Sequence, residues 1–368
     1  MIKIRFKKMS IAILLIALFT GSCSEDIIQE EPRGVFTPEF FQTELGVQGG
    51  LTYLYENLRD IYGFAYFFNM AETGTDEYVP AQSADNNFFD LDLAGQGQLR
   101  PETGFSIGRP WGASWPAINT ASGIIENAAA VGLEQSLIAE AQFFRAFYYF
   151  LMVQSYGGVP LDLGSGELVF NQTAFRTSVR NTVPEVYNRA IIPDLVAAVN
   201  NLPENPRITG AVTKNVARLY LAKAYLTYGW WLENPNNIPT YPETPRVDPD
   251  GNGSAYFFQQ AYNLAVEGIE NPGPYSLLEY FYDVHDGAND RHAEMMLFAE
   301  RTEASPIYNG AIVTGFGGTD DTNAAVWMAT SNYTTISVDG VAAVQREAAQ
   351  SYGRPWTRMA PPITVFTE

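Results

Sequence analysis

The sequence predicts a mainly helical protein in which pairs of amphipathic helices pack together, with long irregular loops and few short strands. Apolar residues recur three or four residues apart in six segments of the chain, which is the spacing of one helix face. Gly, Asn or Pro residues follow several of these segments, where helices normally stop. By contrast, residues 74–110 are polar and Gly-rich without a sustained period. A connection of that length is typical of a functional or disordered loop.

The helices are expected at residues 45–61, 115–131, 139–156, 184–200, 213–231 and 256–270. The segment 139–156 gives the strongest signal, because aromatic and aliphatic residues dominate it and two glycines, at 157 and 158, close it. An Asn-Leu-Pro run at 201–203 predicts the end of the next helix, and Thr213 predicts the cap of the one that follows. Beyond residue 285 the helical signal fades, and residues 294–299 are interpreted as a short buried strand.

Two of the expected helices resemble each other. Residues 141–150 match residues 217–226, an offset of 76 residues, with Ala beside large aromatic or aliphatic residues in both. Small residues that alternate with large ones at helical spacing are typical of tetratricopeptide-type helix pairs. Chance similarity between two amphipathic helices is the alternative.

Two tryptophan pairs are expected to pack inside the protein. Trp111 and Trp115 are four residues apart, on one helical face, and are interpreted as core residues. Trp230 and Trp231 stand at a helix end, where the Pro-rich loop that follows is expected to cover one face of the pair.

The first 22 residues have the order of a secretory signal peptide: basic residues, then an apolar run, then small residues. The apolar run, 11–19, is too short to span a bilayer about 30 Å thick. Cys23, the one cysteine of the chain, follows directly and predicts a lipobox, in which the signal is cut before the cysteine and its sulfur is acylated. Residues 23–36 then form a polar, lipidated tether, and residues 37–368 form the domain.

The charge of the chain excludes one class of partner. The full sequence has a net charge of −19, and removal of residues 1–22 takes away four positive charges and no negative ones, leaving −23. Such a field repels nucleic acid, so no nucleic-acid partner is expected.

The sequence carries no recognisable catalytic constellation, and the protein is therefore interpreted as a non-enzyme. The one cysteine lies in the lipobox, and neither His285 nor His292 belongs to an HExxH motif or a triad order. Pairs of carboxylates for glycoside hydrolysis are too numerous in an acidic chain to single out one. No cofactor is required by this interpretation.

One loop could hold calcium. Asp248, Asp250 and Asn252 place oxygen atoms at every second position, and Gly253 stands sixth, as at the start of an EF-hand loop. Position twelve is Gln259 in place of the bidentate Glu. The Asp-Gly and Asn-Gly pairs also make ordinary turns, so a plain turn and a calcium site both stay open, with the turn favoured.

Four stretches of the chain resemble the SusD/RagB family of nutrient-binding outer-membrane lipoproteins. The first is EPRGVFTPEFF at 31–41 with a following helix that ends in Tyr-Gly at 62–63. The second, and the most specific, is EAQFFRAFYYF at 140–150 continued by YGGVPL at 156–161. The others are AKAYL at 222–226 and RPW at 354–356. Family members are usually longer, so the resemblance also implies that the C-terminal lobe is incomplete here.

The resemblance implies a SusD-like fold and a role at the cell surface. The protein would be anchored to the outer membrane by lipid, bind an oligo- or polysaccharide, and deliver it to a TonB-dependent transporter of the SusC type. A peptide-binding relative and a protein-binding helical-repeat scaffold are the alternatives, and a surface glycosidase is a weaker one. In this family long loops form the ligand face, so the candidate ligand-binding residues are loop aromatics and amides: Asn86, Asn87, Phe88, Phe89, Tyr308, Trp327 and Tyr333.

Overall fold

The computed structural model describes residues 38–58, 61, 79–80, 108–164, 179–285, 289, 291–299 and 359–360. The chain divides into two units, Met1–Phe36 and Thr37–Glu368, and all the described residues belong to the second. The predicted signal peptide, Cys23 and the tether lie outside the described residues.

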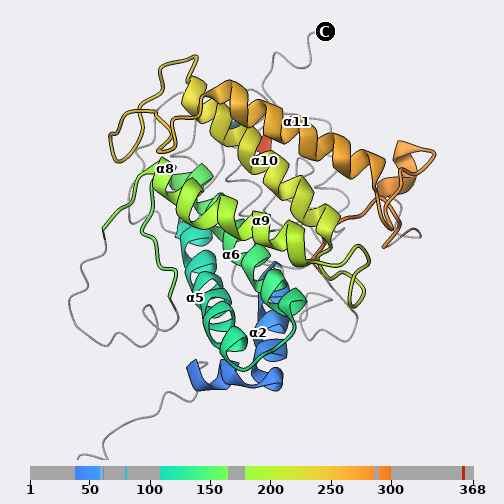
Figure 1. Cartoon of the computed structure of the whole chain (residues 1–368). Coiled ribbons are helices and arrows are strands. Elements are labelled where there is room, and N and C mark those ends of the chain that lie inside the picture. Colours follow the sequence, from blue (N-terminus) through green and yellow to red (C-terminus); the bar gives the residue numbers. More distant parts are fainter. Residues whose placement is uncertain are drawn as a thin grey trace, which may run out of the picture. The chain divides into compact units, whose positions relative to one another are not determined.

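The described part of the chain is mainly helical, as predicted, with two very short strands (Figure 1). Its elements in chain order are η2 (Pro38–Gln42), α2 (Glu44–Glu56), β1 (Val79–Pro80), α5 (Gly108–Ala130), α6 (Gln135–Tyr156), α8 (Val183–Val186), η4 (Tyr187–Ile191), α9 (Ile192–Asn201), α10 (Lys214–Glu233), α11 (Ser254–Glu270), η5 (Phe281–His285) and β2 (Met359–Ala360). The strands pair antiparallel, with Val79 opposite Ala360 and Pro80 opposite Met359.

The helices pack as successive antiparallel neighbours. α5 packs along α6, α9 packs on both α6 and α10, and α10 packs along α11 (Figure 1). α2 contacts α5 and α6 at the other side of this array. The predicted helix pairs are thus present, and α6 lies at their centre.

Several helices begin or end at the residues that the sequence predicted. The hydroxyl of Thr213 accepts a hydrogen bond from the backbone N–H of Val216 at 3.3 Å and starts α10, as predicted. α9 ends at Asn201, also as predicted. Gly157 ends α6 with a φ of 72°, a conformation that a residue with a Cβ rarely adopts.

The single helix predicted at 184–200 is interrupted by a π-helical turn, η4. The backbone N–H of Ile192 donates to the carbonyl of Tyr187, five residues back, where a regular α-helix would use the fourth. Pro193 follows directly and has no N–H to continue the regular ladder. The sequence pattern therefore located the helix correctly, whereas its one-residue widening was not predicted.

The prediction of a buried strand at 294–299 is wrong. The segment consists of turn and irregular backbone with half-buried side chains. A strand needs a partner for its backbone groups, and the elements that contact the core here are helices. Met296 and Leu297 pack against the core from this irregular segment, which explains its apolar character.

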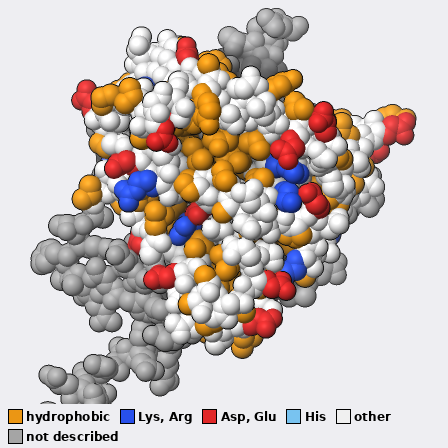
Figure 2. Space-filling model, in the orientation of Figure 1, with side chains coloured by type: hydrophobic (Ala, Val, Ile, Leu, Met, Phe, Trp, Pro, Cys, Tyr) orange, Lys and Arg blue, Asp and Glu red, His pale blue; other side chains and the backbone are white. Residues whose placement is uncertain are grey.

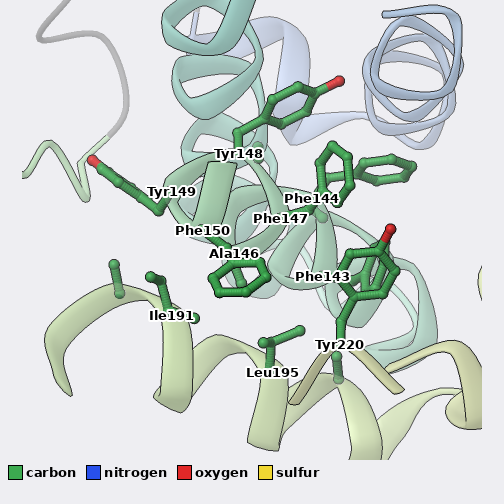
Figure 3. Packing of buried hydrophobic residues seen from close by; sticks show 14 of the residues in the cluster. Phe143, Phe144, Ala146, Phe147, Tyr148, Tyr149, Phe150, Ile191, Leu195 and Tyr220 are labelled. Carbon is green, nitrogen blue, oxygen red and sulfur yellow. The ribbon is translucent and has the colours of Figure 1, made fainter. Parts of the chain in front are cut away.

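α6 forms the centre of the core, and it is apolar on almost all sides because other helices surround it. Figure 3 shows Phe150 lying toward Ile191 and Leu195, Phe143 lying beside Tyr220 of α10, and Tyr148 and Tyr149 pointing to other sides of the helix. The rings of Phe143 and Tyr220 meet edge to face, with their centroids 5.3 Å apart.

The internal repeat is reproduced in part. Ala217 and Tyr220 of α10 are buried like their counterparts in α6. Leu219 and Leu226 are 42% and 46% exposed, although the matching residues of α6, Phe143 and Phe150, are buried. α10 has helices mainly on two sides, α9 and α11, so the same pattern leaves an apolar surface over α10, visible in Figure 2.

Candidate functional site

Two charged residues of α6 lie inside this core and are paired there. The guanidinium of Arg145 donates from Nε and Nη2 to the two carboxylate oxygens of Asp194 in α9, at 2.6 and 2.8 Å. Its Nη1 donates to the carbonyl of Leu163 at 3.1 Å. Burial raises the pKa of the Asp194 carboxyl, and the hydrogen bond from Arg145 opposes that rise. The pair ties α6 to α9 and to the loop after α6.

The second charged residue, Glu140, is 2% exposed and meets residues from two distant segments. Arg207, in the connection between α9 and α10, donates to its oxygens from Nε at 2.8 Å and from Nη2 at 3.1 Å. The hydroxyl of Tyr55 in α2 donates to the same carboxylate at 2.8 Å and accepts from the N–H of Val212 at 2.9 Å. Burial raises the pKa of Tyr55 well above its usual value, and the carboxylate of Glu140 raises it further.

A third contact of α6 fixes the loop that follows it. The hydroxyl of Tyr149 donates to the carbonyl of Asp162 at 2.9 Å and accepts from the N–H of Asp162 at 2.7 Å. Burial raises the pKa of Tyr149 above its usual value of 10.0. The protonated hydroxyl has the donor and the acceptor that the two bonds require. The run at 140–161 is thus an arrangement of buried polar contacts within an aromatic core, and these contacts serve the scaffold.

A surface cavity of about 470 Å³ lies beside the Glu140 network. One wall is the polar face of α2, and the other is the connection between α9 and α10 together with Phe298. The lining residues are Gln48, Thr52, Tyr55, Glu56, Arg207, Ile208, Thr209, Gly210, Ala211 and Phe298. Its volume falls within the range of roughly 300–1,000 Å³ typical of small-molecule sites.

Sequence reasoning did not find this cavity. The signal that could have pointed to it is Glu140, a carboxylate inside an otherwise apolar helix, because a buried carboxylate needs a cation or donors nearby. Its partners come from 67 and 85 residues away along the chain, and nothing in the local pattern names them.

The loop before α11 has the geometry of a turn that closes on its own carboxylate. Asp248 is buried, and its Oδ1 accepts hydrogen bonds from Tyr228 and Asn188, both at 3.1 Å. Its Oδ2 accepts from the backbone N–H groups of Asp250 and Asn252, both at 3.2 Å, and from the side-chain amide of Asn252 at 3.0 Å. A carboxylate surrounded by five donors fits the plain turn. The favoured plain turn and the alternative calcium site at Asp248, Asp250 and Asn252 both stay untested, and a calcium titration separates them.

The tryptophan pairs are less buried than expected. Trp111 is 40% exposed, so its assignment to the core is wrong, while Trp115 is half-buried and packs against the core. Trp231 is covered as expected: the guanidinium of Arg246, from the loop that follows, lies 4.7 Å from its ring centroid. Trp230 is 54% exposed and packs instead beside Phe258 of α11.

The other predicted site residues lie outside the described residues. These are Cys23, the first-loop candidates Asn86, Asn87, Phe88 and Phe89, and the later candidates Tyr308, Trp327 and Tyr333. Within the described part of the chain, no group of three or more His, Cys, Asp or Glu residues is placed to hold a metal ion. Among the helices described, none is both long enough and apolar enough to cross a membrane.

The chain matches known proteins across the region just described. Residues 104–226 match the SusD-like family model described as starch-binding and associating with the outer membrane. A SusD-like protein of Formosa agariphila, P2, is 26% identical over 237 residues, covering 61% of this chain and 44% of that protein. Another from the same organism, P38, is 28% identical over 201 residues, covering 54% of this chain and 38% of that protein. The chain therefore aligns with less than half the length of these relatives.

Solved structures share the fold. A SusD superfamily protein of Bacteroides thetaiotaomicron superposes with a TM-score of 0.58 at 15% identity, covering 87% of this chain and 60% of that one. A laminarin-binding SusD-like protein superposes with a TM-score of 0.54 at 19% identity, covering 76% of this chain and 55% of that one. The matched residues of this chain include the whole of α6 and both partners of its ion pair, Arg145 and Asp194. Together, the family-model match over residues 104–226, the similarity to the curated relatives and the shared fold support a SusD-family protein.

Proposed function

We propose that this protein is a cell-surface lipoprotein that binds a glycan and passes it to a TonB-dependent outer-membrane transporter of the SusC type. The observation that carries the proposal is the SusD-family assignment, whose family description names starch binding and the outer membrane. A structural neighbour that binds laminarin supports a carbohydrate as the ligand.

The described scaffold is consistent with a binding role. Two ion pairs tie its elements together: Arg145 with Asp194, and Arg207 with the buried Glu140. Such groups hold helices in place and are not available to transfer protons to a substrate. The protein is therefore proposed to bind its ligand without catalysing a reaction, with the ligand face in the long loops.

A glycan array probed with the full chain, lacking the signal peptide, tests the ligand class. We expect retention of one or more neutral polysaccharides. Without the signal peptide, which carries four positive and no negative charges, the net charge falls from −19 to −23, and such a chain repels anionic polysaccharides. The retained glycan should be recovered unchanged after long incubation. An array without any bound glycan would contradict the proposal, and release of shorter sugars would establish a glycosidase instead.

The loop candidates are tested by calorimetry with the glycan found on the array. Trp327→Ala and Phe89→Ala should each cost on the order of 1–3 kcal/mol of binding free energy if the ring is a central anchor. Stacking on a sugar face is largely apolar, so affinity should change little between low and moderate salt. Unchanged affinity in both variants would exclude these two rings as anchors.

The anchor is tested by fractionation of cells that express the protein. Cys23→Ala should move the protein from the outer-membrane fraction to the soluble fraction, because the acylated sulfur is removed. A variant that stays in the outer membrane as firmly as the unmodified protein would contradict lipidation at this residue. Co-purification of the anchored protein with a transporter of the TonB-dependent class would test the delivery step.

A further inference from the structure

The cavity between α2 and the α9–α10 connection lies on the described helical scaffold, whereas the proposed ligand face lies in the long loops. Its polar wall is well suited to hydroxyl groups. Gln48 and Thr52 stand four residues apart on one face of α2, and both are exposed. The amide of Gln48 and the hydroxyl oxygen of Thr52 can both accept hydrogen bonds from the hydroxyl groups of a sugar.

The opposite wall supplies an aromatic ring. Phe298 lines the cavity, and its ring packs directly against the backbone of Gly210, which has a φ of 82°. If residue 210 had a Cβ, that atom would lie 3.0 Å from Cζ of Phe298. The irregular segment 291–299, predicted to be a strand, is what brings this ring to the cavity.

The charges of the lining argue against an anionic ligand. Arg207 is the cation among the lining residues, and Glu140 already engages its Nε and Nη2. An anion would therefore meet no uncompensated positive charge among these lining residues. The Gln48 amide donates to Glu44 at 3.1 Å and the Thr52 hydroxyl donates to the carbonyl of Gln48 at 2.8 Å, and the oxygens of both side chains can still accept hydrogen bonds from ligand hydroxyls.

The walls are held rigidly, as a binding site requires. Arg207 is fixed by two hydrogen bonds to the buried Glu140, and Tyr55 of α2 is fixed to the same carboxylate and to Val212. The network therefore connects the α2 wall to the α9–α10 connection. A preformed site loses less entropy when its ligand binds.

From these contacts we infer that the cavity is a second carbohydrate subsite, which takes a neutral mono- or disaccharide unit. The inference rests on the proposed glycan-binding function and adds a second sugar-binding site, which lies on the helical scaffold. The ring of Phe298 contacts the apolar face of the sugar, and Gln48 and Thr52 bind its hydroxyls.

The test uses the full chain without its signal peptide and a panel of neutral sugars: glucose, galactose, mannose, xylose, maltose and cellobiose. Binding is measured by calorimetry for the unmodified protein and for two cavity variants. Phe298→Leu removes the ring but keeps apolar volume, and Thr52→Phe fills the cavity from an exposed helix position. The Thr52 hydroxyl donates only to the carbonyl of Gln48 in its own helix, so this variant should fold normally. Tyr262→Leu, at a residue 65% exposed on α11, is the matched control.

We expect at least one sugar to bind the unmodified protein and both cavity variants to weaken it about tenfold or more, with Tyr262→Leu unchanged. If the glycan array is positive but no panel sugar binds, or both cavity variants bind as well as the unmodified protein, the subsite is refuted and the proposed function stands. An empty array together with a silent panel would refute both.

Discussion

Arg207→Met should destabilise the protein markedly, although Arg207 lies in a surface connection. Glu140 is 2% exposed and receives two of its three hydrogen bonds from Arg207. Methionine keeps much of the apolar stem but leaves the carboxylate with Tyr55 alone. Removing one partner of a buried pair costs about 3–5 kcal/mol. The side chain of Arg207 is 33% exposed, so water screens part of the interaction and we expect about 2–3 kcal/mol.

Urea unfolding at pH 7 measures this loss, provided that the slope against denaturant is unchanged. The double variant Glu140→Gln with Arg207→Met should be at least about 1 kcal/mol more stable than Arg207→Met alone, since the unpaired buried charge is gone. Lys214→Met is the matched control. Lys214 pairs with Glu204 at 3.4 Å, but Glu204 is 48% exposed, so its loss should stay below about 0.5 kcal/mol.

Two results would refute this reasoning. One is a loss below about 0.5 kcal/mol for Arg207→Met, which would mean that the buried carboxylate does not depend on its guanidinium. The other is a double variant no more stable than Arg207→Met, which would mean that the loss comes from packing and not from charge.

Three further predictions concern the helix cap, the helical glycines and calcium. Thr182→Ala should cost about 1 kcal/mol, because Thr182 and Glu185 form a reciprocal cap at the start of α8. The backbone N–H of Thr182 lowers the folded pKa of Glu185 below its usual 4.5, so the stability that Glu185 adds is present above about pH 4.5 and lost as the pH falls through that folded pKa. The advantage over Glu185→Gln in urea unfolding should therefore shrink as the pH is lowered from 7 into the acid range. An advantage that does not change with pH would contradict this origin. Gly50→Ala should destabilise the protein by about 1–3 kcal/mol, because the new methyl would lie 2.8 Å from Phe41 and 2.9 Å from Ile124. Gly112→Ala, with open space around it, should leave stability unchanged or raise it by up to about 1 kcal/mol. Equal effects of the two substitutions on stability would contradict this packing. Millimolar calcium should leave the melting temperature unchanged, because donors surround the carboxylate of the loop before α11, and a rise that Asp250→Ala abolishes would restore a calcium site.

The sequence by itself determined where the helices lie and what class of fold they form. Helical periodicity, the Thr213 cap and the Gly157 terminator depend on contacts within a few residues, so they can be recognised in a linear pattern. The run at 140–150 also carried the family resemblance, because its Ala and aromatic residues are those that pack in the core.

Tertiary structure alone decided which face of each helix is covered. The same spacing that buries Phe143 in α6 leaves Leu219 exposed in α10, because α6 lies among several helices and α10 mainly between two. Local periodicity describes a helix face but not the number of its neighbours. For the same reason the apolar segment 294–299 was mistaken for a strand: its side chains face a helical core that offers its backbone no ladder.

The cavity also depends on contacts that no local pattern encodes. Glu140 meets Arg207 from 67 residues away and Tyr55 from 85 residues away. Phe298, from the segment 291–299, packs against Gly210. A buried carboxylate in an apolar helix tells the reader that partners must exist, since an isolated buried charge is too costly. Which partners satisfy it, and whether a cavity remains beside them, is decided only when the helices have packed.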